Sequence, residues 1–139
     1  MPITKLDITS IQQINLFAKI TSVSAKNCFE YANQIFFAVE PQLVQRAIGQ
    51  NGSNLRSLSN ILKKKVKVVA APSKNDMERF VRMIVYPTKF KKLTEENGQV
   101  MINAGMQSKA SLIGRDHVKL NQLTGIVKQY FDIKEIKIV

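Results

Sequence analysis

The feature that most constrains the fold of this chain is an internal duplication. An offset of 65 positions places Gly49 on Gly114 and aligns the apolar patterns on either side of both glycines. The other matched pairs are Gln34/Gln99, Ile35/Val100, Phe36/Met101, Phe37/Ile102, Ile48/Ile113, Leu55/Leu120, Leu58/Leu123, Ile61/Ile126 and Leu62/Val127. After a short insertion in the second copy near residues 130–132, residues 66–68 match residues 136–138. This register indicates that one supersecondary unit occurs twice.

Each copy is predicted to open with an amphipathic helix. Ser10 with Gln13 and Asn75 with Glu78 have the spacing of a capping box at the helix start. Pro87 should end the second helix at or before residue 86. The expected inward positions are Ile11, Ile14, Phe17 and Ala18 in the first helix and Met77, Phe80, Val81 and Ile84 in the second.

Two extended runs follow in each copy, at residues 26–32 and 34–39 and at residues 90–95 and 99–103. Asn33 and the Asn97-Gly98 pair supply the hairpin turns. Two helices and a closing strand complete each copy. In the first copy, Pro41 suits the first turn of a helix, and the helix after Gly52 has its expected inner positions at Leu55, Leu58, Ile61 and Leu62. We therefore predict an α+β protein of two α-β-β-α-α-β units, each a three-stranded sheet with helices on one face. The expected domains are residues 1–72 and 73–139.

The chain carries a formal charge of +11, shared by both copies. Residues 1–72 hold nine basic and three acidic residues, and residues 73–139 hold twelve and seven. The basic field therefore belongs to the repeated unit rather than to a tail. Such a field favours a polyanionic partner, above all nucleic acid.

Several function classes are excluded by what the sequence lacks. Cys28 is the single cysteine, so neither an internal disulfide nor a cysteine-rich zinc module is expected. No apolar run reaches the length of a membrane span, and the start lacks a signal-peptide pattern, so we expect a soluble, cytoplasmic protein without a membrane partner. No phosphate-binding Walker loop, dinucleotide fingerprint or nucleophile motif is present. Asp116 and His117 lack catalytic partners, and His117 is interpreted as a helix-start residue. We expect a non-enzymatic protein without cofactor or metal.

Residues 49–52, hereafter loop 1, read Gly49-Gln50-Asn51-Gly52 between two predicted helices. Glycine accepts positive φ and lets a backbone approach closely, and the first amides of the next helix favour an anion. Loop 1 is thus a candidate phosphate-binding loop. The alternative is an ordinary helix connection closed by a capping glycine.

A Gly-x-x-Gly loop between two helices of an α-β-β-α-α-β unit resembles the K-homology domain in its type II arrangement. Two such units in tandem resemble the short archaeal form of the NusA family of transcription elongation and termination factors. The resemblance implies binding of a few single-stranded RNA nucleotides, with the glycine loop on the backbone and bases in an adjacent groove. It also implies a role beside RNA polymerase on nascent transcripts. The candidate RNA-binding residues are Arg46, Gly49, Gln50, Asn51, Gly52, Ser53, Asn54 and Arg56 in the first copy and Gly114, Arg115 and Lys119 in the second.

Two departures from the family pattern affect the phosphate site. Loop 1 has neutral Gln50 and Asn51 between its glycines, so the attraction must come from nearby cations, for which Arg46, Arg56 and the lysines at 63–65 are candidates. Residues 114–117, hereafter loop 2, end in His117 instead of a second glycine and contain Asp116. A bulky residue should limit backbone approach, and a carboxylate should repel phosphate. We therefore expect loop 1 to matter more than loop 2.

Three functions stay open at this point. The first is a tandem K-homology protein that binds single-stranded RNA in transcription. The second keeps RNA binding but places it in ribosome assembly or RNA processing, and a pull-down for polymerase subunits or ribosomal particles separates these two. The third is a basic module that docks on an acidic protein, and competition between RNA and an acidic protein surface separates it from the others. Phe29, Phe36 and Phe37 could stack on bases, but their positions in a buried hairpin favour the core.

Overall fold

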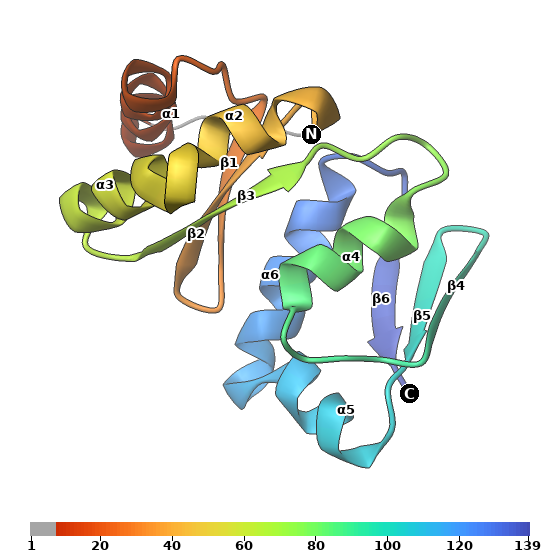
Figure 1. The fold of residues 1–139 in the computed structure, drawn as a ribbon. Helices are drawn as coiled ribbons and strands as arrows, with labels where there is room; N and C mark the ends of the chain where they lie inside the picture. The colour runs from red at the N-terminus through yellow and green to blue at the C-terminus, as the bar shows by residue number, and fades with distance from the viewer. Residues whose placement is uncertain (1–7) are drawn as a thin grey trace. The chain divides into compact units, whose positions relative to one another are not determined.

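The computed structural model describes residues 8–139, and the chain divides into two compact units between Ala71 and Pro72 (Figure 1). Unit 1 ends at Ala71 and unit 2 begins at Pro72. Within the described residues, each unit contains three α-helices and one three-stranded sheet.

Unit 1 has its antiparallel and parallel strand pairs in one sheet. Its elements are α1 (Ile8–Thr21), β1 (Asn27–Tyr31), β2 (Gln34–Val39), a 3₁₀ turn (Pro41–Leu43), α2 (Val44–Ile48), a 3₁₀ turn (Gln50–Gly52), α3 (Ser53–Leu62) and β3 (Lys65–Ala70). β2 is the central strand, antiparallel to β1 and parallel to β3. The tight β1–β2 turn uses positive φ at Ala32 (51°) and Asn33 (63°), as a two-residue hairpin requires. The parallel pair is joined through α2 and α3, and loop 1 lies between these two helices in the middle of the crossover connection.

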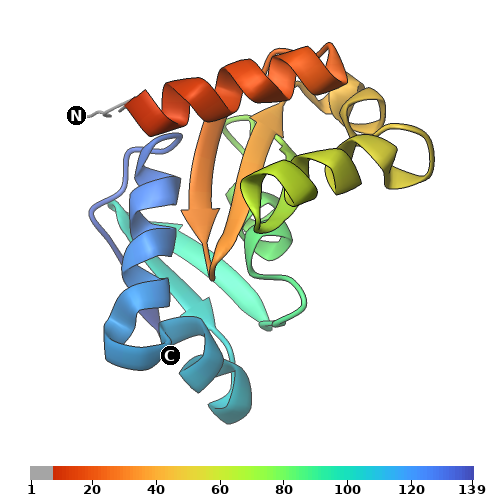
Figure 2. The same ribbon diagram turned by 90° about the vertical axis from the view of Figure 1, so that its left-hand side faces the viewer.

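The core of unit 1 lies between this sheet and its helices (Figure 2). Phe37 of β2 stacks on Phe17 of α1 with ring centroids 4.3 Å apart, and Leu58 of α3 is fully buried in the same cluster. On the opposite side of the strands, Phe36 stacks on Phe29 at 5.4 Å. All three of the hairpin phenylalanines are buried, which confirms their assignment to the core rather than to a base-stacking surface.

Unit 2 repeats this topology. Its elements are α4 (Met77–Val85), β4 (Lys92–Glu96), β5 (Gln99–Asn103), α5 (Met106–Ile113), a 3₁₀ turn (Arg115–His117), α6 (Val118–Lys128) and β6 (Glu135–Ile138). β5 is central, antiparallel to β4 and parallel to β6, and α4 and α6 lie on one side of the sheet (Figure 1). The predicted α+β class with tandem α-β-β-α-α-β order is confirmed.

The strand registers also confirm the predicted alignment of the two copies. Ile35 pairs with Val66 in unit 1, and Val100 pairs with Ile136 in unit 2. Val100 lies 65 positions after Ile35, whereas Ile136 lies 70 after Val66, so unit 2 has five additional residues before β6. One of them lengthens α6 and four lengthen the connection from α6 to β6. Because the strand pairing is unchanged, the insertion does not affect the sheet.

Both predicted helix starts were wrong. The described part of α1 is already helical at Ile8, three residues before the predicted start at residue 11, so Ser10 lies inside the helix. α4 begins after Asp76 rather than after Asn75, with no side-chain hydrogen bond at this cap. The Asp76 amide instead donates to the Ser73 carbonyl (3.2 Å), and this turn sets the start of α4. The predicted end of α4 is confirmed at Val85, two residues before Pro87.

Two predicted core positions were also wrong. Ile11 is 45% exposed and Ile61 is 55% exposed. Ile61 lies in the last turn of α3. Leu62, the next residue and about 100° further round the helix, packs on the core as predicted. The helical period selects a face about 100° wide, and the neighbouring elements decide which edge of that face is covered.

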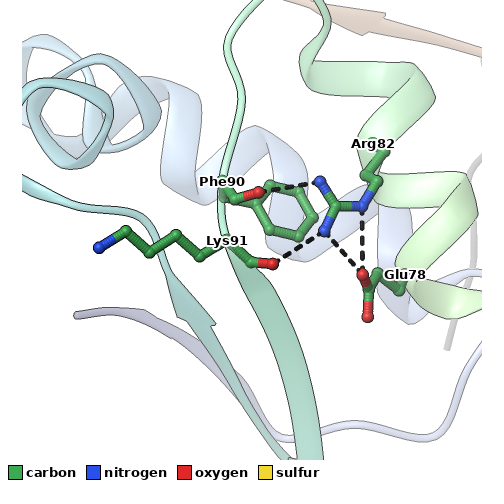
Figure 3. A network of polar contacts seen from close by, with 4 residues as sticks. All are labelled: Glu78, Arg82, Phe90 and Lys91. Atoms are coloured by element: carbon green, nitrogen blue, oxygen red, sulfur yellow. Dashed lines mark hydrogen bonds and ion pairs between the residues drawn. The ribbon is translucent and has the colours of Figure 1, made fainter.

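Arg82 of α4 connects this helix to the chain before β4 (Figure 3). Its guanidinium donates to Glu78 Oε2 from Nε (3.1 Å) and Nη2 (2.7 Å), to the Phe90 carbonyl (2.9 Å) and to the Lys91 carbonyl (3.1 Å). The guanidinium carbon lies 4.1 Å from the Phe90 ring centroid. The fixed fork of arginine allows these contacts at once, so Arg82 has a structural role.

Replacement of Arg82 by methionine is expected to destabilise unit 2 by about 1 to 2 kcal/mol. The loss comes from the carbonyl bonds and the ring contact, since an exposed helical ion pair contributes only about 0.3 to 0.5 kcal/mol. Urea unfolding of Arg82→Met measures it. Arg79→Met, on the exposed side of the same helix, is the matched control and should stay within about 0.5 kcal/mol of the parent. Equal effects of the two changes would contradict the structural role.

Candidate nucleic-acid interface

Loop 1 has a backbone that depends on its first glycine. Gly49 adopts φ 83° and ψ 167°, a region open essentially only to glycine. Asn51 (φ 56°, ψ 28°) and Gly52 (φ 72°, ψ 19°) are left-handed. The Gly49 amide donates to the Gln45 carbonyl and the Gly52 amide to the Gly49 carbonyl, both at 3.1 Å. These bonds end α2 and reverse the chain into α3 within four residues.

Asn54 packs against Gly49 and holds the two helices together. A Cβ atom on Gly49 would lie 2.9 Å from Asn54 Cγ, which is closer than real side chains allow. Asn54 Nδ2 donates to the carbonyls of Ala47 (3.2 Å) and Arg46 (3.4 Å) at the end of α2. The amide of Asn54 is thus engaged in capping α2, a role that the sequence analysis missed. An asparagine five residues after a helix-ending glycine was the available signal.

The second glycine of loop 1 leaves space and has a cation beside it. The atom nearest to a Cβ on Gly52 is Arg56 Nη1, at 3.6 Å. The same Nη1 donates to the Asn51 carbonyl. Arg56 therefore lies at the loop, where the first turn of α3 has no acidic residue. The positive end of the α3 dipole and the guanidinium together favour an anion.

The other predicted residues of unit 1 lie around this point. Arg46, Gln50, Asn51 and Ser53 are exposed, at the end of α2, in loop 1 and at the start of α3. The lysines at 63–65 lie at the opposite end of α3, about 15 Å away by the helical rise. Lys64 forms an ion pair with Glu30. Burial lowers the pKa of Lys67 on β3, and the charge of Lys65 lowers it further.

Loop 2 has nearly the same backbone as loop 1 although it lacks the second glycine. Gly114 adopts φ 74° and ψ 173°, Asp116 φ 54° and ψ 28°, and His117 φ 63° and ψ 16°. The His117 amide donates to the Gly114 carbonyl (3.3 Å), as Gly52 does in loop 1. The glycine-only conformation occurs at the first position of both loops, whereas histidine tolerates the left-handed conformation of the last. The loop backbone is therefore nearly the same with histidine as with glycine at its last position. His117 immediately precedes α6, as predicted.

The two loops differ in their side chains. The aliphatic chain of Lys119 packs on Gly114, as Asn54 packs on Gly49 in loop 1. A Cβ atom added to Gly114 would lie 2.9 Å from both Cβ and Cγ of Lys119. Asn121 stands at the offset of Arg56, so this position of α6 has no guanidinium. Arg115, Asp116 and His117 are all exposed. Loop 2 thus presents one arginine beside one carboxylate.

In the part of the chain that the structure describes, every helix is too short or too polar to cross a membrane.

Comparisons with known proteins point in one direction. No protein-family model matches the chain. The chain is 24% identical to the probable transcription termination protein NusA of Methanocaldococcus jannaschii, over 97% of this chain and 75% of that protein. It is 26% identical to the protein of the same name from Halococcus morrhuae, over 96% of both. The protein of that name from Methanococcus vannielii is 22% identical, over 97% of this chain and 79% of its own length.

A solved structure shares the fold. The crystal structure of APE1850 superposes with a TM-score of 0.66 at 27% identity, and the match covers 96% of this chain and 99% of that one. Coverage this complete includes both three-stranded units. Over nearly its whole length, the chain therefore resembles archaeal proteins named NusA, as the tandem K-homology pattern of its sequence indicates.

Proposed function

We propose that this chain binds single-stranded RNA, with loop 1 against the phosphate backbone, and that it acts as a NusA-like transcription elongation and termination factor without catalytic activity. The observation that carries the proposal is the geometry of loop 1. The start of α3 combines three features. These are the glycine-only conformation of Gly49, the open space beside Gly52 and the guanidinium of Arg56. This combination suits a phosphate group.

Two further observations support the RNA partner. Loop 2 in unit 2 has nearly the same backbone turn as loop 1 but different side chains. This is consistent with a second and weaker contact between unit 2 and the RNA strand. The charge of +11 attracts any polyanion. The transcriptional role, including contact with RNA polymerase, rests on the names of the archaeal relatives.

Binding is expected to favour single-stranded over duplex RNA, because the loop meets one backbone and base contacts require unstacked bases. If about 4 phosphates are neutralised, the log-log slope of affinity against salt should be near −3. This corresponds to a roughly 50-fold loss between 50 and 200 mM salt. Fluorescence anisotropy with a labelled strand, alone and annealed to its complement, measures both quantities. Equal affinity for the duplex would exclude base contacts, and a slope near zero would exclude the phosphate site.

The positive charge of the chain could alternatively serve to bind an acidic protein. Addition of an acidic protein or polyglutamate as competitor should displace labelled RNA only at a large excess, because a carboxylate chain offers neither phosphate groups nor bases. Displacement at equimolar amounts would favour the protein-docking alternative.

A further inference from the structure

A pocket of about 240 Å³ opens in unit 1 between α1, β1 and the end of α3. Its apolar floor includes Ile35 of β2 and Leu62 of α3. Ile35 is buried and Leu62 packs on the same core cluster, so the floor is fixed by the fold. The pocket lies at the end of α3 opposite loop 1 and shares none of the phosphate-site residues.

Polar groups surround this floor. Ser10 and Gln13 of α1, Cys28 and Glu30 of β1, and Lys64 after α3 line the pocket. Cys28 donates its S–H to Gln13 Oε1 (3.2 Å), and Lys64 forms an ion pair with Glu30. The rim therefore combines a hydroxyl, an amide that both donates and accepts, and a pair of opposite charges.

We propose that this pocket receives a nucleobase of the bound RNA strand, an inference that rests on the proposed function. A cavity of about 150 Å³ holds benzene, so 240 Å³ admits one heterocyclic ring with its exocyclic groups. A base has apolar faces and a polar edge, which match the floor and the rim. A purely apolar ligand would make no use of the polar rim, and a small anion would make no use of the floor.

The length of α3 sets the spacing between the two sites. Its ten residues span about 15 Å, which equals about four nucleotides at the roughly 3.4 Å rise of a stacked strand. The lysines at 63–65 lie at the pocket end of this path. A strand held at loop 1 that follows α3 thus reaches the pocket, whereas a dinucleotide held at loop 1 does not.

The single cysteine of the sequence makes the pocket directly observable. Cys28 lines it and is half-buried, so a maleimide reagent reports access to this place alone. In the full chain, a saturating single-stranded RNA hexanucleotide should slow labelling at least fivefold. A dinucleotide, or a nucleoside monophosphate at the same concentration, should slow it less than twofold. Anisotropy with the same hexanucleotide measures binding independently of the thiol.

A pair of neighbouring glutamines supplies matched variants. Gln13 lines the pocket and Gln12 is exposed on the same helix. Gln13→Leu should weaken hexanucleotide binding roughly tenfold and leave dinucleotide binding unchanged, while Gln12→Leu should change neither. A thermal melt shows whether either variant alters folding. Loss of dinucleotide binding in Gln13→Leu would indicate a structural effect and would overturn the base contact.

The outcomes separate this inference from the proposed function. If the hexanucleotide binds but Cys28 is labelled at the same rate, the pocket assignment is wrong and the phosphate site at loop 1 stands. If the mononucleotide protects Cys28 as well as the hexanucleotide does, the pocket takes a free nucleotide and its link to the strand is overturned. If no RNA binds, the proposed function and this inference fail together.

Discussion

Replacement of Gly49 by alanine is expected to destabilise unit 1 by about 2 to 3 kcal/mol. Alanine at φ 83° and ψ 167° is strained, and its Cβ would lie 2.9 Å from Asn54 Cγ. Relief of that clash would move Asn54 away from the Ala47 carbonyl that it caps. Denaturation in urea, followed by circular dichroism, gives the free energy of unfolding.

The second glycine of the same loop is the matched control. Gly52 is left-handed, but a Cβ there meets only Arg56 Nη1 at 3.6 Å, so Gly52→Ala should cost about 1 kcal/mol. Gly52→His, which copies loop 2, should cost less than Gly49→Ala because His117 already adopts this conformation. Equal losses at the two glycines would contradict the different demands that the structure places on them.

Replacement of both Gln50 and Asn51 by aspartate is expected to weaken single-stranded RNA binding at least tenfold, or about 1.4 kcal/mol. Both side chains are exposed in loop 1, and the two carboxylates would stand where the phosphate is proposed. The glycines that shape the loop remain, so folding should survive. Anisotropy measures the affinity, and circular dichroism with thermal melting checks the fold. A folded variant with normal affinity would refute the phosphate site at loop 1.

Arg115→Asp makes a comparable charge change in loop 2 and should produce a smaller loss. Arg115 already lies beside Asp116, and α6 has Asn121 at the offset where α3 carries Arg56. The shared backbone of the two loops makes the comparison direct, because any difference comes from side chains. A larger loss for Arg115→Asp would make unit 2 the main RNA contact and reverse the order of the two loops.

Much of the fold was predictable because it depends on short-range chemistry. The offset that pairs Gly49 with Gly114 predicted the same sheet topology twice, and the registers at Ile35 and Val100 confirm it. Pro87 ended α4 because proline restricts the residue before it. Phe36 and Phe37 are neighbours on a strand, so their side chains point to opposite faces of the sheet. Both rings are buried because the central strand is covered on both faces. These features were determined by the sequence itself.

The details of the candidate site were decided by tertiary structure. Loop 2 lacks the second glycine in sequence, and only the structure showed that His117 adopts nearly the same left-handed conformation as Gly52. Asn54 and Arg56 are both polar residues in the first turn of α3, yet only the packing of α2 directs one to a helix end and the other to Gly52. The pocket is likewise lined by residues that lie far apart in the sequence, from Ser10 in α1 to Lys64 after α3. The physical reason is that spacing fixes local backbone geometry, whereas the surroundings of a side chain depend on elements that only the folded chain brings together.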